Sequence, residues 1–127
     1  MMAPGRAEAL DVLVNASVAQ EEIGIGQLYA IFTGRSRYWD DGSSITVVMY
    51  REDVDVQKEF CRDILDMPAR KLRFSWNYVS FAGIGREPII VESKQEMLDK
   101  INSIPHSIGF VDLLDDQEGD WYVLEIK

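Results

Sequence analysis

The sequence predicts an α/β domain with a mostly parallel central sheet of about five strands flanked by helices. Short apolar runs typical of buried strands alternate with segments whose apolar residues recur at helical spacing. This alternation favours parallel strands joined by crossover helices. The chain has 127 residues, enough for one hydrophobic core but not for two lobes and a linker. We expect residues 1–10 to be a disordered or artificially added start, and residues 11–127 to form one domain.

The first elements follow from local patterns in the chain. An apolar run at residues 12–14 predicts a buried strand, and apolar residues spaced three or four apart predict a helix over 25–32. Gly34 suits the left-handed cap that ends such a helix. A turn at 40–43 leads into residues 45–50, which are rich in β-branched residues and are expected to form a strand buried on both faces.

Two helices are expected in the middle of the chain. The first opens near Asp53 or Asp55, because either side chain suits the N-cap position. The second has Pro68 in its first turn and is broken by residues 81–85. The residues expected to point inward from these helices are Val56, Phe60, Ile64, Met67, Leu72, Trp76 and Val79.

The last third predicts three strands and one helix. Residues 88–91 form a short strand, and the capping box Ser93–Glu96 starts a helix that Pro105 ends. Two strands follow at 108–111 and 121–126. The predicted order is therefore strand, helix, strand, helix, helix, strand, helix, strand, strand.

The charge of the chain excludes some classes of partner. Thirteen basic and twenty-two acidic residues give a formal net charge of −9. Nucleic acid and anionic membrane surfaces are disfavoured, because both require a basic face. Residues 51–90 hold seven basic residues, so an anion-binding face is expected there. No apolar run approaches the ~20 residues needed to span a bilayer, so we expect no direct membrane insertion.

Catalysis has little support in the sequence. His106 directly follows Pro105 at a helix end and is expected to be a loop or capping residue. Cys61 lies beside Phe60 in a helical segment and is expected to be a buried structural thiol. No nucleophile elbow, phosphate-binding glycine loop or cluster of metal ligands is recognisable. We therefore expect no enzymatic activity, no metal and no cofactor.

The most specific pattern runs from Leu28 to Gln57. It reads LYAIFTGR, then YW, then ITVV, and then RED. This stretch resembles the segment of phosphate ABC-transporter substrate-binding proteins in which an IF-x-G-K/R…W helix end precedes an ITVV-x-R-x-D strand.

The resemblance continues along the chain to roughly residue 112. Met67, Trp76, Phe81 and Gly83 are placed like an M…W…F-x-G block in short members of that family, and residues 105–111 look like its P-G-A-I-G-Y-V. The resemblance implies one lobe of a type 2 periplasmic-binding-protein fold. It also implies a periplasmic or secreted location, although the chain as given begins without the apolar stretch of a signal peptide.

One departure from the family concerns the anion site. In the family the strand ends in R-x-D-G-S-G-T, whose Ser, Gly and Thr hold phosphate at a helix N-terminus. Here Arg51 and Asp53 match, but residues 54–57 read Val-Asp-Val-Gln. Loss of the glycines hinders close backbone approach, and Asp55 adds a repulsion on the order of 1–4 kcal/mol. We expect Asp55 to cap the N-terminus of its own helix, so that this helix end is closed to ligand.

Residual anion contact is assigned to Arg51, Asp53, Asp55 and Gln57. Arg51 is the main candidate, since a guanidinium offers a two-pronged contact to phosphate or sulfate. The alternative is a surface arginine paired with Glu52 or Asp53.

A second departure is length, because one lobe cannot clamp a ligand against another. The sequence therefore predicts a non-catalytic, solute-binding-like domain with weak or no affinity for phosphate or another small oxyanion. The alternative is a protein-interaction, sensory or accessory module that uses the former cleft face. It would act as a homodimer or with a membrane transporter or signalling partner. Tyr38 and Trp39 are the expected exposed contact pair, whereas Trp76 is expected to be core.

Overall fold

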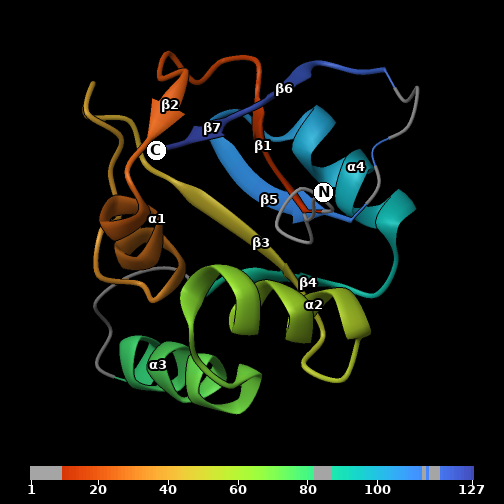
Figure 1. Ribbon diagram of the computed structural model, residues 1–127. Helices are drawn as coiled ribbons and strands as arrows, with labels where there is room; N and C mark the ends of the chain where they lie inside the picture. The colour runs from red at the N-terminus through yellow and green to blue at the C-terminus, as the bar shows by residue number, and fades with distance from the viewer. Residues whose placement is uncertain (1–9, 82–86, 113, 115–117) are drawn as a thin grey trace, which may run out of the picture.

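The computed structural model describes residues 10–81, 87–112, 114 and 118–127. Figure 1 shows the elements in chain order. They are β1 (Asp11–Asn15), β2 (Glu22–Ile23), α1 (Ile25–Phe32), β3 (Thr46–Tyr50), α2 (Asp55–Phe60), the π-helical turn η2 (Cys61–Leu65), α3 (Ala69–Phe81), β4 (Ile89–Val91), α4 (Lys94–Ser103), β5 (Ser107–Val111), β6 (Trp121–Val123) and β7 (Glu125–Ile126).

The central sheet has five strands in the order β4-β3-β5-β1-β6. Strand β3 runs parallel to β4 and β5, whereas β1 is antiparallel to both of its neighbours, β5 and β6. Four of the five strands thus point the same way, which is the mostly parallel sheet that the sequence predicts.

The strand expected at residues 121–126 is divided in two. The backbone N–H of Leu124 donates to the Val12 carbonyl at 2.8 Å, and the chain then leaves the central sheet. Strand β7 pairs instead with β2, a two-residue strand that the sequence patterns did not predict, in a small parallel sheet. Both strands are too short for a side-chain periodicity to be visible.

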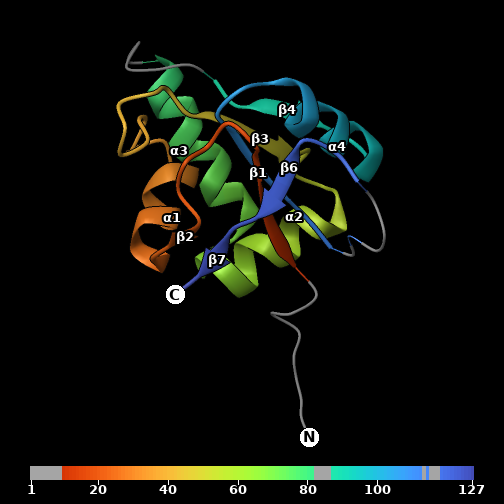
Figure 2. The ribbon, with the colours of Figure 1, turned by 90° about the horizontal axis from the view of Figure 1, so that it is seen from above.

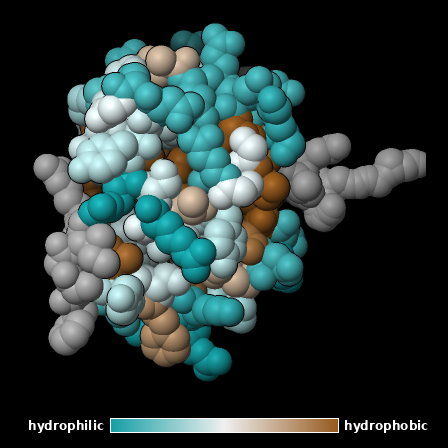
Figure 3. Space-filling model, turned by 90° about the vertical axis from the view of Figure 1, so that its left-hand side faces the viewer, coloured by the Kyte–Doolittle hydropathy of each residue, from teal (hydrophilic) through white to brown (hydrophobic). Residues whose placement is uncertain are grey.

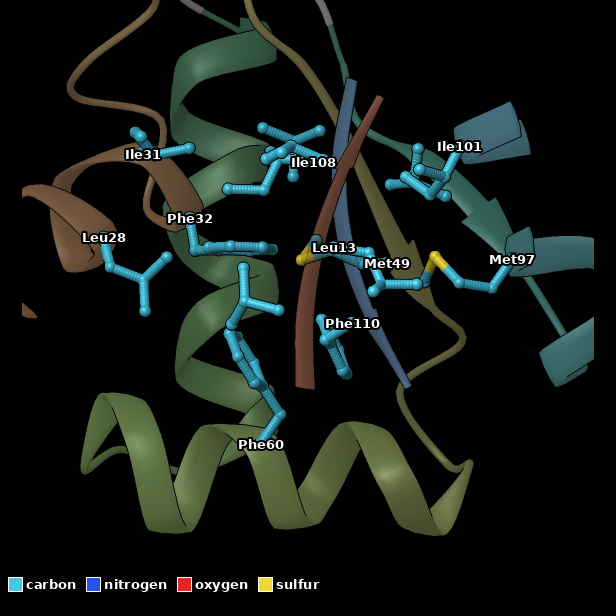
Figure 4. Close-up of a cluster of buried hydrophobic side chains, with 14 of the residues drawn as sticks. Leu13, Leu28, Ile31, Phe32, Met49, Phe60, Met97, Ile101, Ile108 and Phe110 are labelled. Carbon is cyan, nitrogen blue, oxygen red and sulfur yellow. The ribbon is translucent and has the colours of Figure 1, made fainter. Parts of the chain in front are cut away.

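Helices pack on both faces of the sheet (Figures 1 and 2), and two consecutive residues of β5 show why. A Cβ at Gly109 would lie 2.5 Å from Met97 Sδ, so the absence of a side chain lets α4 approach this face closely. Phe110 points to the opposite face. There it stacks on Phe60 of α2 with ring centroids 3.8 Å apart, and it meets Phe32 of α1 edge-on (Figure 4).

The hydrophobic core lies between the sheet and the helices (Figure 4). The strands predicted to be buried are buried, since Leu13 and Val48 have no exposed surface. The inward residues predicted for α3, Leu72, Trp76 and Val79, are also buried. Leu10, the last residue of the start expected to be disordered, is buried against this core, and residues 1–9 lie outside the described residues.

Gly34 confirms the left-handed cap predicted for the end of α1. Its φ is +83°, and its N–H donates to the Ile31 carbonyl at 3.2 Å. A Cβ at this position would lie 2.9 Å from Val79 Cγ2. Glycine therefore ends α1 and also leaves room for α3 to pack against this end.

The prediction that Asp53 or Asp55 caps α2 is wrong. The N-cap is Val54, which makes no side-chain capping bond, and Asp55 is the first helical residue. The Asp53 carboxylate instead accepts a hydrogen bond from Arg51 Nε at 2.6 Å. A charged guanidinium donor is a stronger partner for a carboxylate than a backbone N–H, which explains the difference.

The inward face of α2 and η2 is also shifted from the predicted one. Val56 and Ile64 are only half-buried, whereas Gln57, Cys61 and Leu65 are buried together with Phe60. The π-helical turn changes the angular spacing after Phe60, so a strict 3.6-residue pattern fails there. Met67 is buried as expected, but it follows the end of the helix.

The capping box of α4 is confirmed, because the Glu96 N–H donates to Ser93 Oγ at 3.2 Å. The Glu96 carboxylate accepts in turn from the N–H of Glu92 at 2.7 Å. The expected break after α3 falls mostly outside the described residues, as does Gly83. None of the helices in the described ranges combines the length and apolar character needed to cross a membrane.

Candidate functional site

Arg51 directly follows β3 at the carboxyl edge of the sheet. Its backbone N–H donates to the Val91 carbonyl at the end of β4, at 2.9 Å. This bond holds the loops after β3 and β4, residues 51–54 and 92–93, side by side. We refer to the edge formed by these two loops as the former cleft face, because the residues predicted to contact an anion follow β3 there.

The Arg51 guanidinium is held between two carboxylates. Its Nε lies 2.6 Å from Asp53 Oδ1, and Nη1 lies 2.8 Å from Glu92 Oε2. The hydrogen bond from Arg51 holds the pKa of the Asp53 carboxyl below its usual value, and Asp53 and Glu92 raise the pKa of Arg51. All three side chains are exposed. The alternative of a surface arginine paired with Asp53 is confirmed.

Glu52, the other partner considered for Arg51, pairs elsewhere. Its carboxylate lies 2.6 Å from Arg73 Nε of α3. Sequence reasoning missed Glu92, although a signal was present. Glu92 follows a strand next to β3, and the carboxyl ends of parallel strands meet at one edge of a sheet.

The Gln57 side chain is turned into the protein and is 3% exposed. Its Oε1 accepts a hydrogen bond from the N–H of Tyr50 at 3.0 Å, and its Nε2 faces the sulfur atoms of Met49 and Cys61. The amide thus satisfies a backbone donor at the end of β3. The structure does not bring Gln57 to the surface beside Arg51.

Part of the backbone around the start of α2 is hydrogen-bonded within its own segment. The N–H of Val54 donates to the Arg51 carbonyl at 3.0 Å, and those of Gln57 and Lys58 donate to the Val54 carbonyl. Asp55 is exposed at the first helical position and adds negative charge beside Asp53. These backbone bonds engage three amides of the segment, and the Asp55 carboxylate opposes an anion at this helix end.

A pocket of about 370 Å³ lies beside Arg51, between α3 and the strands β3 and β4. Its lining is mostly apolar, and Trp76 Nε1, a potential donor in its wall, already donates to the Phe32 carbonyl at 2.7 Å. Its lining includes Arg51, Arg73, Trp76, Asn77 and Ile90. Such a pocket suits an apolar group better than a hydrated oxyanion.

The expected exposed pair Tyr38 and Trp39 is only half correct. Tyr38 is 56% exposed, but Trp39 is 4% exposed. The Trp39 indole N–H donates to the carbonyl of His106 at 3.0 Å, and burial follows because this polar atom finds a backbone partner inside the protein.

His106 and Cys61, the two residues considered for catalysis, lie in a turn and in the core, respectively. His106 lies in the turn before β5, as expected, with a φ of +64°. Cys61 is fully buried, and burial raises the pKa of its thiol to about 11. Within the described ranges, no group of three or more His, Cys, Asp or Glu side chains could hold a metal ion.

Comparison with known proteins identifies the fold. No protein-family model matches the chain, and no curated protein matches it in sequence. Among solved structures, PstS from Borrelia burgdorferi superposes with a TM-score of 0.72 at 18% identity, over 93% of this chain and 47% of that one. An ABC-type phosphate transport receptor from Vibrio cholerae gives 0.63 at 16% identity, over 92% and 45%.

A third structure, described as a putative phosphate ABC transporter substrate-binding protein from Clostridium perfringens with bound phosphate, gives 0.72 at 12% identity, over 92% and 44%. The chain thus spans less than half the length of these proteins. The fold is that of one lobe of a periplasmic binding protein, as the sequence resemblance implies.

Proposed function

We propose that this domain is a non-catalytic, solute-binding-like lobe related to phosphate ABC-transporter substrate-binding proteins, with a degenerate anion site. It acts in the periplasm or as a secreted domain, and it binds phosphate weakly or not at all. The observation that carries the proposal is the position of Arg51 between Asp53 and Glu92. The carboxylates of Asp53 and Glu92 already pair with the guanidinium that would contact an oxyanion.

The charges around Arg51 support this proposal. Asp53 and Glu92 place two carboxylates against Arg51, and Lys58 contributes a positive charge that acts on Asp53. Asp55 adds an exposed negative charge two residues after Asp53. A phosphate ion would have to displace two carboxylates from the guanidinium and would then remain close to them. Repulsion between like charges opposes that exchange.

The backbone supports the proposal independently of charge. Gln57 is committed to the N–H of Tyr50, and the amides of Val54 and Lys58 donate within their own segment. No glycine stands between Arg51 and Gln57 to let an anion approach the main chain.

Phosphate titration tests the proposal. The protein is melted in increasing sodium phosphate up to about 10 mM, and sodium chloride of equal ionic strength is the control. A ligand with a dissociation constant near 10 mM would stabilise the fold by only about 0.4 kcal/mol at that concentration. We expect no saturable rise in melting temperature beyond the chloride control. Saturable binding in the micromolar range would overturn the proposal.

A second candidate function is a protein-interaction, sensory or accessory module that uses the former cleft face. The pocket beside Arg51 favours it, because the pocket is mostly apolar and Ile90 of the edge strand β4 is 52% exposed there. Its partner would be a second copy, a membrane transporter or a signalling protein. Light scattering over a range of concentrations tests the homodimer, and Ile90→Glu would abolish a dimer that uses this pocket.

A further inference from the structure

The outer side of α3 combines basic and aromatic side chains. Arg70, Phe74 and Tyr78 are four residues apart and follow one line along the helix. Phe74 is 54% exposed and Tyr78 is 68% exposed, whereas the opposite side of the helix is buried in the core. Tyr78 is thus largely in water, and Phe74 is exposed although the Arg73 guanidinium lies 5.2 Å from its ring centroid.

A groove separates this side of α3 from the end of α1. It has a volume of about 490 Å³, and Arg35, Arg37, Ser75 and Tyr78 contribute to its walls. Gly34 lies in its floor, where the close packing of Val79 brings the two helices together. We call the exposed surface around this groove the α1–α3 face. Its members are Arg35, Arg37, Arg70, Lys71, Phe74 and Tyr78.

The basic residues of the α1–α3 face make no ion pair within the described part of the chain. Among the described residues, the ion pairs use Arg51, Arg62, Arg73, Lys94 and Lys127, and none involves Arg35, Arg37, Arg70 or Lys71. The sequence of α3 contains no acidic residue. Four cations without an ion pair among the described residues thus lie on α3 and after the end of α1, in a chain whose net charge is −9, and Arg35 lies over the Tyr29 ring at 5.8 Å.

Figure 3 shows the side of the molecule on which α1 and one end of α3 lie. Apolar patches reach the surface there between strongly hydrophilic side chains. Arginine and aromatic residues are enriched at the positions that contribute most of the binding energy in protein interfaces.

We propose that the α1–α3 face binds an acidic segment of a partner protein, in which carboxylates flank an aromatic or apolar side chain. The carboxylates pair with Arg35 and Arg37 at the groove, and the apolar side chain packs on Phe74 and Tyr78. This surface is distinct from the former cleft face. Arg73 and Asn77 line the pocket beside Arg51, whereas Ser75 and Tyr78 line the groove.

The charge of the α1–α3 face and of the whole chain favours an acidic protein segment over a second copy, a lipid surface or a nucleic acid. A two-fold dimer through this face would bring the Arg70 and Lys71 side chains of both copies close to one another. An anionic lipid surface or a nucleic acid would repel the remainder of a chain with a net charge of −9. A short acidic segment can contact the basic face without approaching the acidic remainder of the domain.

The experiment uses a fluorescent synthetic peptide that repeats Glu-Glu-Trp, with a Gln-Gln-Trp peptide as its uncharged match. We expect saturable binding of the acidic peptide, weakened by added salt, with chemical-shift changes in a ¹⁵N-labelled domain concentrated at residues 35–38 and 70–79. The double variant Arg35→Ala/Arg37→Ala is expected to weaken binding about tenfold, and Tyr78→Ala about fivefold.

The matched control is Arg62→Ala/Lys100→Ala, which removes two exposed positive charges from η2 and α4. It is expected to change peptide affinity less than about twofold. All variants are first compared by thermal melting, since the altered side chains are exposed.

Several results would overturn the inference. They are equal loss in the control variant, equal binding of the Gln-Gln-Trp peptide, and shift changes centred on Arg51. Binding only to phosphatidylglycerol vesicles would assign the face to a membrane, and self-association lost in Arg35→Ala/Arg37→Ala would assign it to a second copy. None of these results depends on whether the protein binds phosphate, so this inference and the proposed function can fail separately.

Discussion

Arg51 and Glu92 form an ion pair that joins the loops after two neighbouring parallel strands, with Nη1 2.8 Å from Oε2. The two residues are far apart in sequence, and the register of β3 on β4 brings them to the same edge of the sheet. Arg51 thereby has a second carboxylate partner in addition to Asp53.

Removing both carboxylates should restore anion affinity. In Asp53→Asn/Glu92→Gln, the guanidinium keeps its position but loses both negative partners, so phosphate affinity should rise about tenfold or more. The amide shifts of residues 51–56 during a phosphate titration measure the change. Glu21→Gln/Glu125→Gln alters the net charge equally at exposed positions elsewhere. A double variant that binds phosphate no better than this control would contradict a self-occupied site.

Gln57 should contribute to stability rather than to ligand binding. Leucine at this position has a similar size but cannot accept the hydrogen bond from the N–H of Tyr50. Leaving that buried donor unsatisfied should lower the free energy of unfolding by about 1–3 kcal/mol. Urea denaturation measures the loss. Asp55→Asn, on the exposed side of the same helical turn, should change the stability by less than about 0.5 kcal/mol.

Alanine substitutions at Gly34 and Gly26 should change the free energy of unfolding in opposite directions. Gly34 has a φ of +83°, and a Cβ added there would lie 2.9 Å from Val79 Cγ2, so Gly34→Ala should destabilise by about 2 kcal/mol or more. Gly26 lies in α1 with open space around it, so Gly26→Ala should stabilise by about 0.5–1 kcal/mol. Thermal unfolding of both variants checks the pair. Equal effects would argue against the cap geometry of α1.

Cys61 should make the stability fall at alkaline pH. Burial raises the pKa of its thiol from 9.0 to about 11, so the folded state keeps a proton that the unfolded state loses. This contribution is fully present below pH 9 and is lost as the pH rises towards 11. Urea denaturation at several pH values should show the decline, and Cys61→Ala should show less of it. An identical decline in both proteins would assign the effect to other groups, such as Tyr50, whose pKa burial also raises.

Some features of the site could be predicted from the sequence because their causes are local. The cap at Gly34 follows from a helix that must end in a left-handed residue, and the box Ser93–Glu96 satisfies free amides of its own helix. The absence of glycine between Arg51 and Gln57 is likewise visible in the sequence. The roles assigned to Arg51, Asp53, Asp55 and Gln57 as anion contacts stay predictions.

Other features depend on contacts between distant segments. Asp53 does not cap α2, because its carboxylate accepts a hydrogen bond from the charged Arg51 guanidinium instead. Trp39 is buried because its indole N–H can donate to the His106 carbonyl. Gln57 faces inward because its amide meets the N–H of Tyr50, and the π-helical turn after Phe60 changes the angular spacing of the residues that follow it. Periodicity cannot anticipate such choices, since several partners compete for each polar atom.

The sequence by itself determined the alternation of strands and helices, the mostly parallel sheet and the excess of acidic charge, because these depend on side-chain type and spacing. Only the tertiary structure decided that Glu92 pairs with Arg51, that Gln57 accepts a hydrogen bond from the backbone of β3, and that Arg35 and Arg37 share a groove with Tyr78. The reason is physical: electrostatic and hydrogen-bond partners are chosen by distance in space, and chain folding sets that distance between residues that are remote in sequence.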